Sequence, residues 1–105
     1  MAHELAEQLA GLASRVNNLA VNHTGDDSRT FFDLQNQLID LSEKAILADL
    51  DNEAASYGKA LDGLNAAIKF IGEAEDSIAN VSQAIQLITK AVGLAEKAIG
   101  AAAKV

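Results

Sequence analysis

Hydrophobic residues recur every three or four positions along most of the chain, which predicts amphipathic α-helices rather than strands. The first helix is expected over about residues 2–21. The turn-forming run Asn22–Ser28 follows it, where Gly25 can adopt a positive φ and the Asn, Thr, Asp and Ser side chains favour turns and caps. Its apolar face consists of Leu5, Leu9, Leu12, Val16 and Leu19, widened by Ala6, Ala13 and Ala20.

A second helix is expected over about residues 28–50, with Asp27 or Ser28 as its N-cap. Its main apolar face again alternates steps of three and four, and a parallel row at heptad spacing adds to it. The main face is Phe31, Leu34, Leu38, Leu41, Ala45 and Ala48, and the flanking row is Phe32, Ile39 and Ile46.

The phase of the pattern shifts near residues 48–55, which predicts a break and a third helix over about residues 52–71. Asp51 or Asn52 is its candidate N-cap. One long helix with a rotated buried face is the alternative, and it would reduce four helices to three. The shifted face consists of Leu47, Leu50, Ala54, Tyr57, Leu61, Leu64, Ile68 and Ile71.

A long fourth helix is expected over about residues 73–104, after Gly72 as a C-terminal cap. Acidic residues open this segment and lysines close it, in agreement with the helix dipole. Two adjacent apolar rows cover more than half of its circumference. The first is Ala74, Ile78, Val81, Ile85, Ile88, Val92, Ala95 and Ile99, and the second is Ala84, Leu87, Ala91, Leu94, Ala98 and Ala101.

A helix that is apolar most of the way round is normally buried. Three interpretations fit the fourth helix: it is central in its own bundle, one of its rows meets a partner or a second copy, or it enters a membrane. The uncharged run Ser77–Thr89 is 13 residues long, whereas a transmembrane helix needs about 20. We therefore reject a permanent membrane span, and we expect the contact surface to be Leu87, Ala91, Leu94 and Ala98.

The composition supports an all-α protein in one domain. The chain has 105 residues, of which 21 are alanine, and it has no proline and no cysteine. Alanine is the strongest helix former, and the absence of proline leaves helices unbroken. Because alanine buries little apolar area, the core is thin and self-association would add stability. We predict a small antiparallel bundle of four helices in up-down order, with short connections.

The charge distribution argues against nucleic acid as a partner. The net charge is −7: residues 1–76 carry fourteen acids and five bases, and residues 77–105 carry one acid and three bases. An acidic surface repels phosphate backbones and anionic lipid. The apolar fourth helix is thus also the weakly basic part of an acidic chain.

No group of residues predicts catalysis, a cofactor, a metal or a small-molecule substrate. His23 stands beside Asp26 and Asp27, but a metal site needs three or four ligands, and these residues also suit a solvated turn. His3 stands near the N-terminus, where the helix is expected to fray. The run Asp49–Glu53 lacks the glycine and the distal glutamate of a calcium loop.

We expect a non-catalytic protein that acts through protein–protein interaction, including self-association through its last helix. The alternative is a small secreted or toxin-associated helical protein, either an acidic immunity or chaperone partner of a basic protein or a membrane-active bundle. Because Glu4 and Glu7 stand where a signal peptide would be basic, a cytoplasmic location is the default expectation, with leaderless secretion left open.

Overall fold

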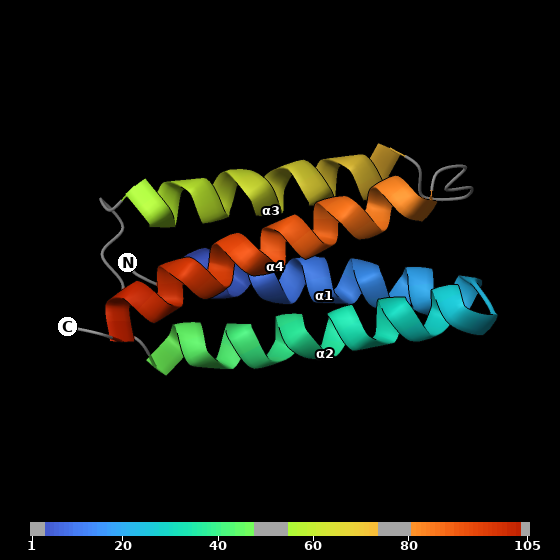
Figure 1. Ribbon diagram of the computed structural model, residues 1–105, viewed down its shortest axis with the longest axis horizontal. Helices are drawn as coiled ribbons and strands as arrows, with labels where there is room; N and C mark the ends of the chain where they lie inside the picture. The colour runs from blue at the N-terminus through green and yellow to red at the C-terminus, as the bar shows by residue number, and fades with distance from the viewer. Residues whose placement is uncertain (1–3, 48–54, 74–80, 104–105) are drawn as a thin grey trace.

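The computed structural model describes residues 4–47, 55–73 and 81–103, and within these ranges it forms four α-helices. They are α1 (Glu4–Asn22), α2 (Gly25–Leu47), α3 (Ala55–Glu73) and α4 (Val81–Ala103). Successive helices alternate in direction (Figure 1). The predicted all-α bundle of four helices is therefore confirmed, and the three-helix alternative is wrong.

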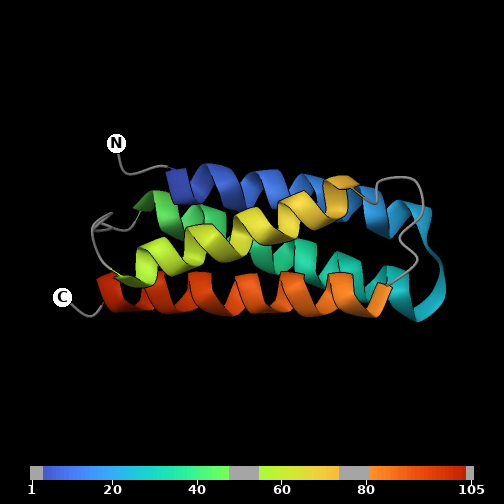
Figure 2. The same ribbon diagram turned by 90° about the horizontal axis from the view of Figure 1, so that it is seen from above.

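Two helical hairpins, α1–α2 and α3–α4, make up the bundle. The most extensive contacts lie within each hairpin, and α1 also packs on α3 and α2 on α4. The helices therefore follow each other around the bundle in the order α1, α2, α4, α3, which the view from above also shows (Figure 2). Each hairpin consequently keeps one outer face, and the two outer faces lie on opposite sides of the molecule.

Several helix boundaries differ from the sequence prediction. The second helix begins at Gly25 rather than near Ser28, so that only His23 and Thr24 separate it from α1. Gly25 has a φ of 68°, which confirms the positive φ expected there. The third helix continues to Glu73, a residue assigned above to the start of the fourth. The candidate caps Asp51 and Asn52, and the first part of the predicted fourth helix, lie outside the described residues.

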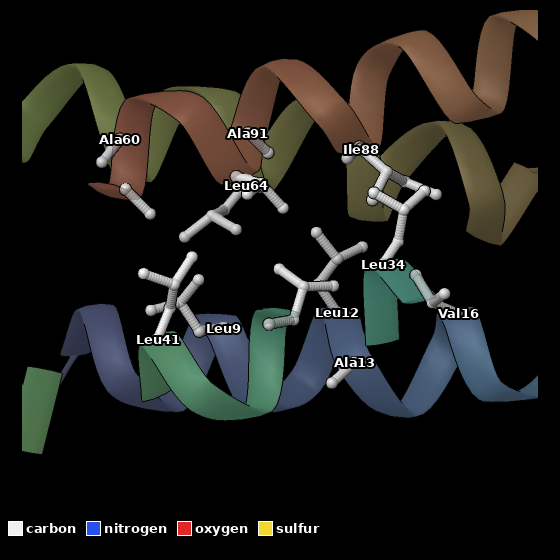
Figure 3. Packing of buried hydrophobic residues seen from close by; sticks show 14 of the residues in the cluster. Leu9, Leu12, Ala13, Val16, Leu34, Leu41, Ala60, Leu64, Ile88 and Ala91 are labelled. Carbon is white, nitrogen blue, oxygen red and sulfur yellow. The ribbon is translucent and has the colours of Figure 1, made fainter. Parts of the chain in front are cut away.

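The core lies where the first two apolar faces predict it. Every residue of the α1 face is buried, and so are Phe31, Leu34, Leu38, Leu41 and Ala45 of α2. Figure 3 shows side chains from both hairpins meeting in the middle of the bundle, among them Leu9, Leu41 and Leu64. Apart from the hydroxyl of Tyr57, no polar or charged side-chain group is buried in the described part of the chain. The hydrophobic effect therefore holds this interior together without a polar network.

The buried face of α3 differs from the prediction. The fully buried residues between Tyr57 and Ile71 include Ala60 and Ala67, while Leu61 and Ile68 are only half-buried at the core's edge. Leu47, expected on this same face, ends α2 and is 88% exposed. The predicted row, with Leu61 and Ile68, and the observed row, with Ala60 and Ala67, both alternate steps of three and four. The small alanines of the observed row let α3 approach the other helices closely. The prediction chose the row with leucine and isoleucine because their side chains are larger than that of alanine.

Candidate interaction surfaces

The structure divides the four predicted contact residues of α4 into two pairs. Ala91 and Ala98 are buried in the protein's own core, with exposures of 0% and 4%. Leu87 and Leu94 are half-buried and pack against the edge of that core. A partner that meets the folded bundle at this place would therefore touch only the two leucines.

Leu87 and Leu94 border a shallow groove on the outer face of the α3–α4 hairpin, which we call the α3–α4 groove. Its volume is about 330 Å³. A Cβ added at Gly63 would lie 2.8 Å from Cδ1 of Leu94 and 3.6 Å from Cα of Ala91. The missing side chain of Gly63 thus lets α4 lie close to α3 and lets Leu94 extend over it. The lining residues are Lys59, Asp62, Gly63, Ala66, Leu87, Lys90 and Leu94.

The charges around the α3–α4 groove are mainly positive. Lys59 and Lys90 are exposed, one on each wall, and Asp62 is the single acid of the lining. None of the three forms an ion pair with another described residue. The groove therefore presents an apolar bottom between two unpaired ammonium groups, and an anionic group on an incoming surface could bind either of them.

A second candidate surface lies on the other hairpin. Phe32, Ile39 and Ile46 of α2 are 40%, 41% and 54% exposed, and we call them the apolar row. Their heptad spacing keeps them in one line along the helix. Ile39 also borders a hollow of about 300 Å³ between α1 and α2, together with Ala10, Ser14 and Glu43. The row therefore faces outward beside α1.

The sequence contained the apolar row as a flanking row, and the expectation that it adds to the buried face of α2 is not met. The structure shows why. The positions of α2 that face α1 belong to Ser28, Gln35 and Ser42, and they pair with the small residues of α1. Each residue of the apolar row follows one of these three residues by four positions, so the row lies beside them and farther round the helix. Of the groove on the other hairpin, the periodic pattern indicated only Leu87 and Leu94, because the shape of the groove depends on Gly63 and on the register of two helices.

Hydrogen bonds fix the α1–α2 hairpin, and so the orientation of the apolar row. The hydroxyl of Ser28 donates to the carbonyl oxygen of Ala20 at 2.7 Å, and that of Ser42 donates to Ala6 at 3.1 Å. The two serines are two heptads apart on α2, as the two alanines are on α1. This match holds the antiparallel register over most of the hairpin.

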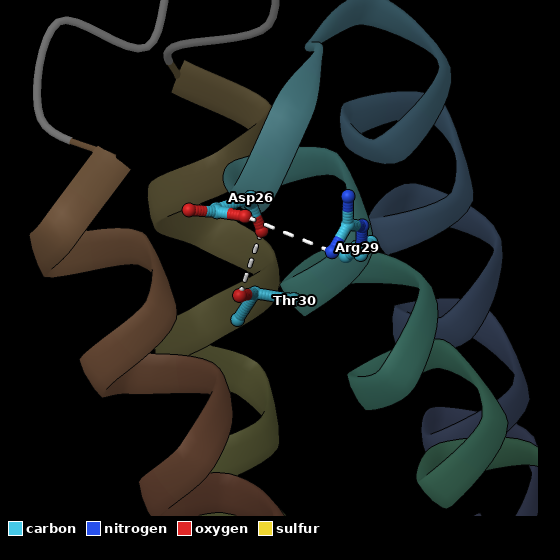
Figure 4. A network of polar contacts seen from close by, with 3 residues as sticks. All are labelled: Asp26, Arg29 and Thr30. Atoms are coloured by element: carbon cyan, nitrogen blue, oxygen red, sulfur yellow. Dashed lines mark hydrogen bonds and ion pairs between the residues drawn. The ribbon is translucent and has the colours of Figure 1, made fainter.

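The residues considered as metal ligands serve the helix junction instead. Nδ1 of His23 lies 2.7 Å from the carbonyl oxygen of Leu19, and because a carbonyl only accepts, Nδ1 carries the proton. The His23 ring also packs on Phe31 at 5.4 Å. Asp26 accepts a bond from Thr30 at its backbone oxygen and lies 3.9 Å from Arg29 (Figure 4). No cluster of three potential metal ligands occurs among the described residues.

Tyr57 joins the two hairpins. Its side chain is buried, and its hydroxyl oxygen accepts the backbone N–H of Leu5 at 3.3 Å. The first N–H groups of a helix have no partner within it. A residue of α3 therefore satisfies one N–H group at the N-terminus of α1.

The helices were also compared with the requirements of a membrane span, and the chain with known proteins. None of the helices, over the residues described, is at once long and apolar enough to cross a membrane. Comparison with known proteins finds no matching family model, no matching curated protein and no matching solved structure. The functional interpretation therefore rests on the two outer faces of the bundle.

Proposed function

We propose that this protein is a non-catalytic helical bundle that acts through protein–protein interaction, including self-association. The observation that carries the proposal is the apolar row, with three large side chains exposed in one line on a helix whose other face already fills the core. Scattered apolar residues are normal on surfaces, whereas aligned ones on a helix indicate docking. The leucine edge of α4, Leu87 and Leu94, is a second surface of the same kind.

The absence of polar groups in the core supports the same class. A catalytic site requires positioned acids, bases or nucleophiles in a sheltered place. Here the charged residues of the described part lie on the surface, and the interior is hydrocarbon apart from the Tyr57 hydroxyl. The surface has shape, exposed apolar area and charge, and these are the properties through which proteins recognise each other.

The experiment substitutes Leu94→Glu at the α4 edge and measures molar mass by light scattering over a range of protein concentrations. We expect at least a tenfold weaker assembly, because a carboxylate would enter the apolar bottom of the groove. Helicity by circular dichroism should stay near that of the parent, since Leu94 is only half-buried. Thr89→Glu, on the exposed side of α4, is the matched control and should assemble as the parent does.

Two outcomes contradict the proposal. A parent protein that stays monomeric at every concentration removes self-association. A Leu94→Glu variant that loses its helical signal would instead place Leu94 among the residues on which the fold depends, and the contact surface would then be restricted to the apolar row.

One observation favours a second candidate, an acidic partner of a basic protein. Residues 4–47 carry seven acids and three bases, and Glu43, unpaired among the described residues, borders the same hollow as Ile39 of the apolar row. An acidic border around an apolar row fits a basic amphipathic helix. Binding of a synthetic Lys/Leu amphipathic peptide that weakens steeply with salt and is lost in Ile39→Asp supports this candidate, and salt-independent binding counts against it.

A further inference from the structure

We propose that the apolar row of one copy docks into the α3–α4 groove of a second copy. This inference rests on the proposed function and names the partner of both surfaces. The groove requires an occupant with apolar side chains at helical spacing and with acidic groups to meet Lys59 and Lys90. The α2 face of the same protein carries both.

The spacing of the two surfaces agrees. Neighbouring residues of the apolar row are one heptad apart, about 10.5 Å at 1.5 Å per residue. Leu87 and Leu94 on the wall of the groove are also one heptad apart. A helix laid along the groove could therefore place two successive members of its row beside the two leucines. Ala66, which lines the opposite wall, has a small side chain and leaves room for them.

The charges of the two hairpins are complementary. Residues 4–47 have seven acids and three bases, whereas residues 55–73 and 81–103 together have three acids and four bases. Near the contact, Glu43, which borders the same hollow as Ile39, would face the lysines of the groove. Asp62 is the one acid in the groove, and it leaves the lining with a net positive charge. A row docked on the row of a second copy would bring like charges together instead.

The positions of the two surfaces decide the kind of assembly. The apolar row lies on the outer face of α1–α2 and the groove on the outer face of α3–α4, at opposite sides of the bundle. A contact between two different surfaces is heterologous, and it continues from copy to copy unless the rotation closes a ring. The proposal therefore predicts chains or rings of bundles rather than a closed two-fold dimer.

The test uses two variants of the whole protein, each with one surface removed. Ile39→Glu places a charge in the middle of the apolar row. Lys59→Glu combined with Lys90→Glu reverses the charge of the groove at two exposed positions. Each variant alone should lose assembly at least tenfold, because each lacks one of the two surfaces. An equimolar mixture should form a 1:1 dimer by light scattering, since the intact groove of the first accepts the intact row of the second.

Matched controls carry the same charge changes elsewhere. Gln37→Glu adds a carboxylate to an exposed position of α2 off the row, and Lys69→Glu with Lys97→Glu reverses two exposed lysines outside the groove lining. Both controls should assemble like the parent. Circular dichroism of all variants checks that the helices persist, and if Ile39→Glu loses helicity, Ile39→Gln replaces it.

Other results would overturn the inference. If the groove variant alone still self-associates, the copies meet row to row; if the row variant alone does, they meet groove to groove. A mixture that stays monomeric, although the parent assembles, refutes the heterologous contact but leaves self-association standing. A monomeric parent refutes both, so failure of this inference and failure of the proposed function are distinguishable.

Discussion

The two hairpins solve the same packing problem in different ways. In α1–α2, alanines at heptad spacing on α1 lie against polar residues of α2, and serine hydroxyls bond to the carbonyls of the opposite helix. In α3–α4, Ala91 of α4 lies close to Gly63, and, leaving Gln83 aside, no side-chain hydrogen bond joins the described residues of the two helices. Close approach of two helices thus needs small residues on one helix, while the residues that face them on the other helix can be polar side chains or a glycine.

The outer faces of the hairpins differ as well. All five large hydrophobic side chains that are strongly exposed in the described part belong to α1 and α2: Val21, Phe32, Ile39, Ile46 and Leu47. The α3–α4 hairpin instead keeps its leucines half-buried along a groove with two lysines. The first hairpin projects apolar side chains and negative charge, and the groove of the second has the shape and charge that the proposed contact requires. This difference is the basis of the proposed head-to-tail contact.

The largest expected effect tests whether the hairpins fold as one unit. Phe31→Ala removes a fully buried side chain of α2 and should cost about 3–5 kcal/mol in the free energy of unfolding. Because Tyr57 of α3 packs in the same core, tyrosine fluorescence and circular dichroism should report coincident urea transitions. Phe32→Ala, one position along, is the matched control and should cost about 1 kcal/mol or less. Two separate transitions would show that the hairpins unfold independently.

The next effect compares the small residues that line each hairpin. Ala91→Leu forces a larger side chain against the backbone of α3 at Gly63, and overpacking of this kind costs about 1–3 kcal/mol. Ala13→Leu should cost less, because Ala13 borders the hollow beside Ile39 and the new side chain can extend into it. Urea unfolding of both variants gives the difference. Equal costs would mean that the hollow offers no room and that both hairpins are packed alike.

The smallest effect concerns the two serine hydrogen bonds that join α1 and α2. Ser28→Ala and Ser42→Ala each remove one hydroxyl that donates to an α1 carbonyl, and each should lower stability by about 0.5–1.5 kcal/mol. Ser14→Ala, on the exposed side of α1, should stay within about 0.5 kcal/mol of the parent. Thermal unfolding measures all three. If Ser14→Ala lowered stability as much as Ser42→Ala does, the hydrogen bonds between the two helices would not be what stabilises this hairpin.

The fold was predictable because a single periodic signal dominates the chain. The faces of the first two helices, Leu5 to Leu19 and Phe31 to Ala45, are buried as their spacing predicts. The face of α3 was predicted less well, because alanines and leucines occupy neighbouring rows of equal period. Periodicity identifies the apolar side of a helix, but which of two neighbouring rows on that side is buried depends on how closely the helices approach.

The candidate surfaces were predictable only in part. Phe32, Ile39 and Ile46 stand out in the sequence, yet their exposure follows from Ser28, Gln35 and Ser42 taking the positions beside α1. Leu87 and Leu94 were recognised, but the burial of Ala91 between them depends on Gly63, a residue of another helix. Such contacts between helices distant in sequence leave no pattern in a single chain.

The most direct measurement of the central claim is the molar mass of the unaltered protein as a function of concentration, by sedimentation equilibrium at low and high salt. Head-to-tail contact predicts a mass that rises beyond that of two chains with concentration, and that falls as salt screens the charges of Lys59 and Lys90. A constant mass of one chain, or a plateau at two chains that salt does not change, would contradict the account.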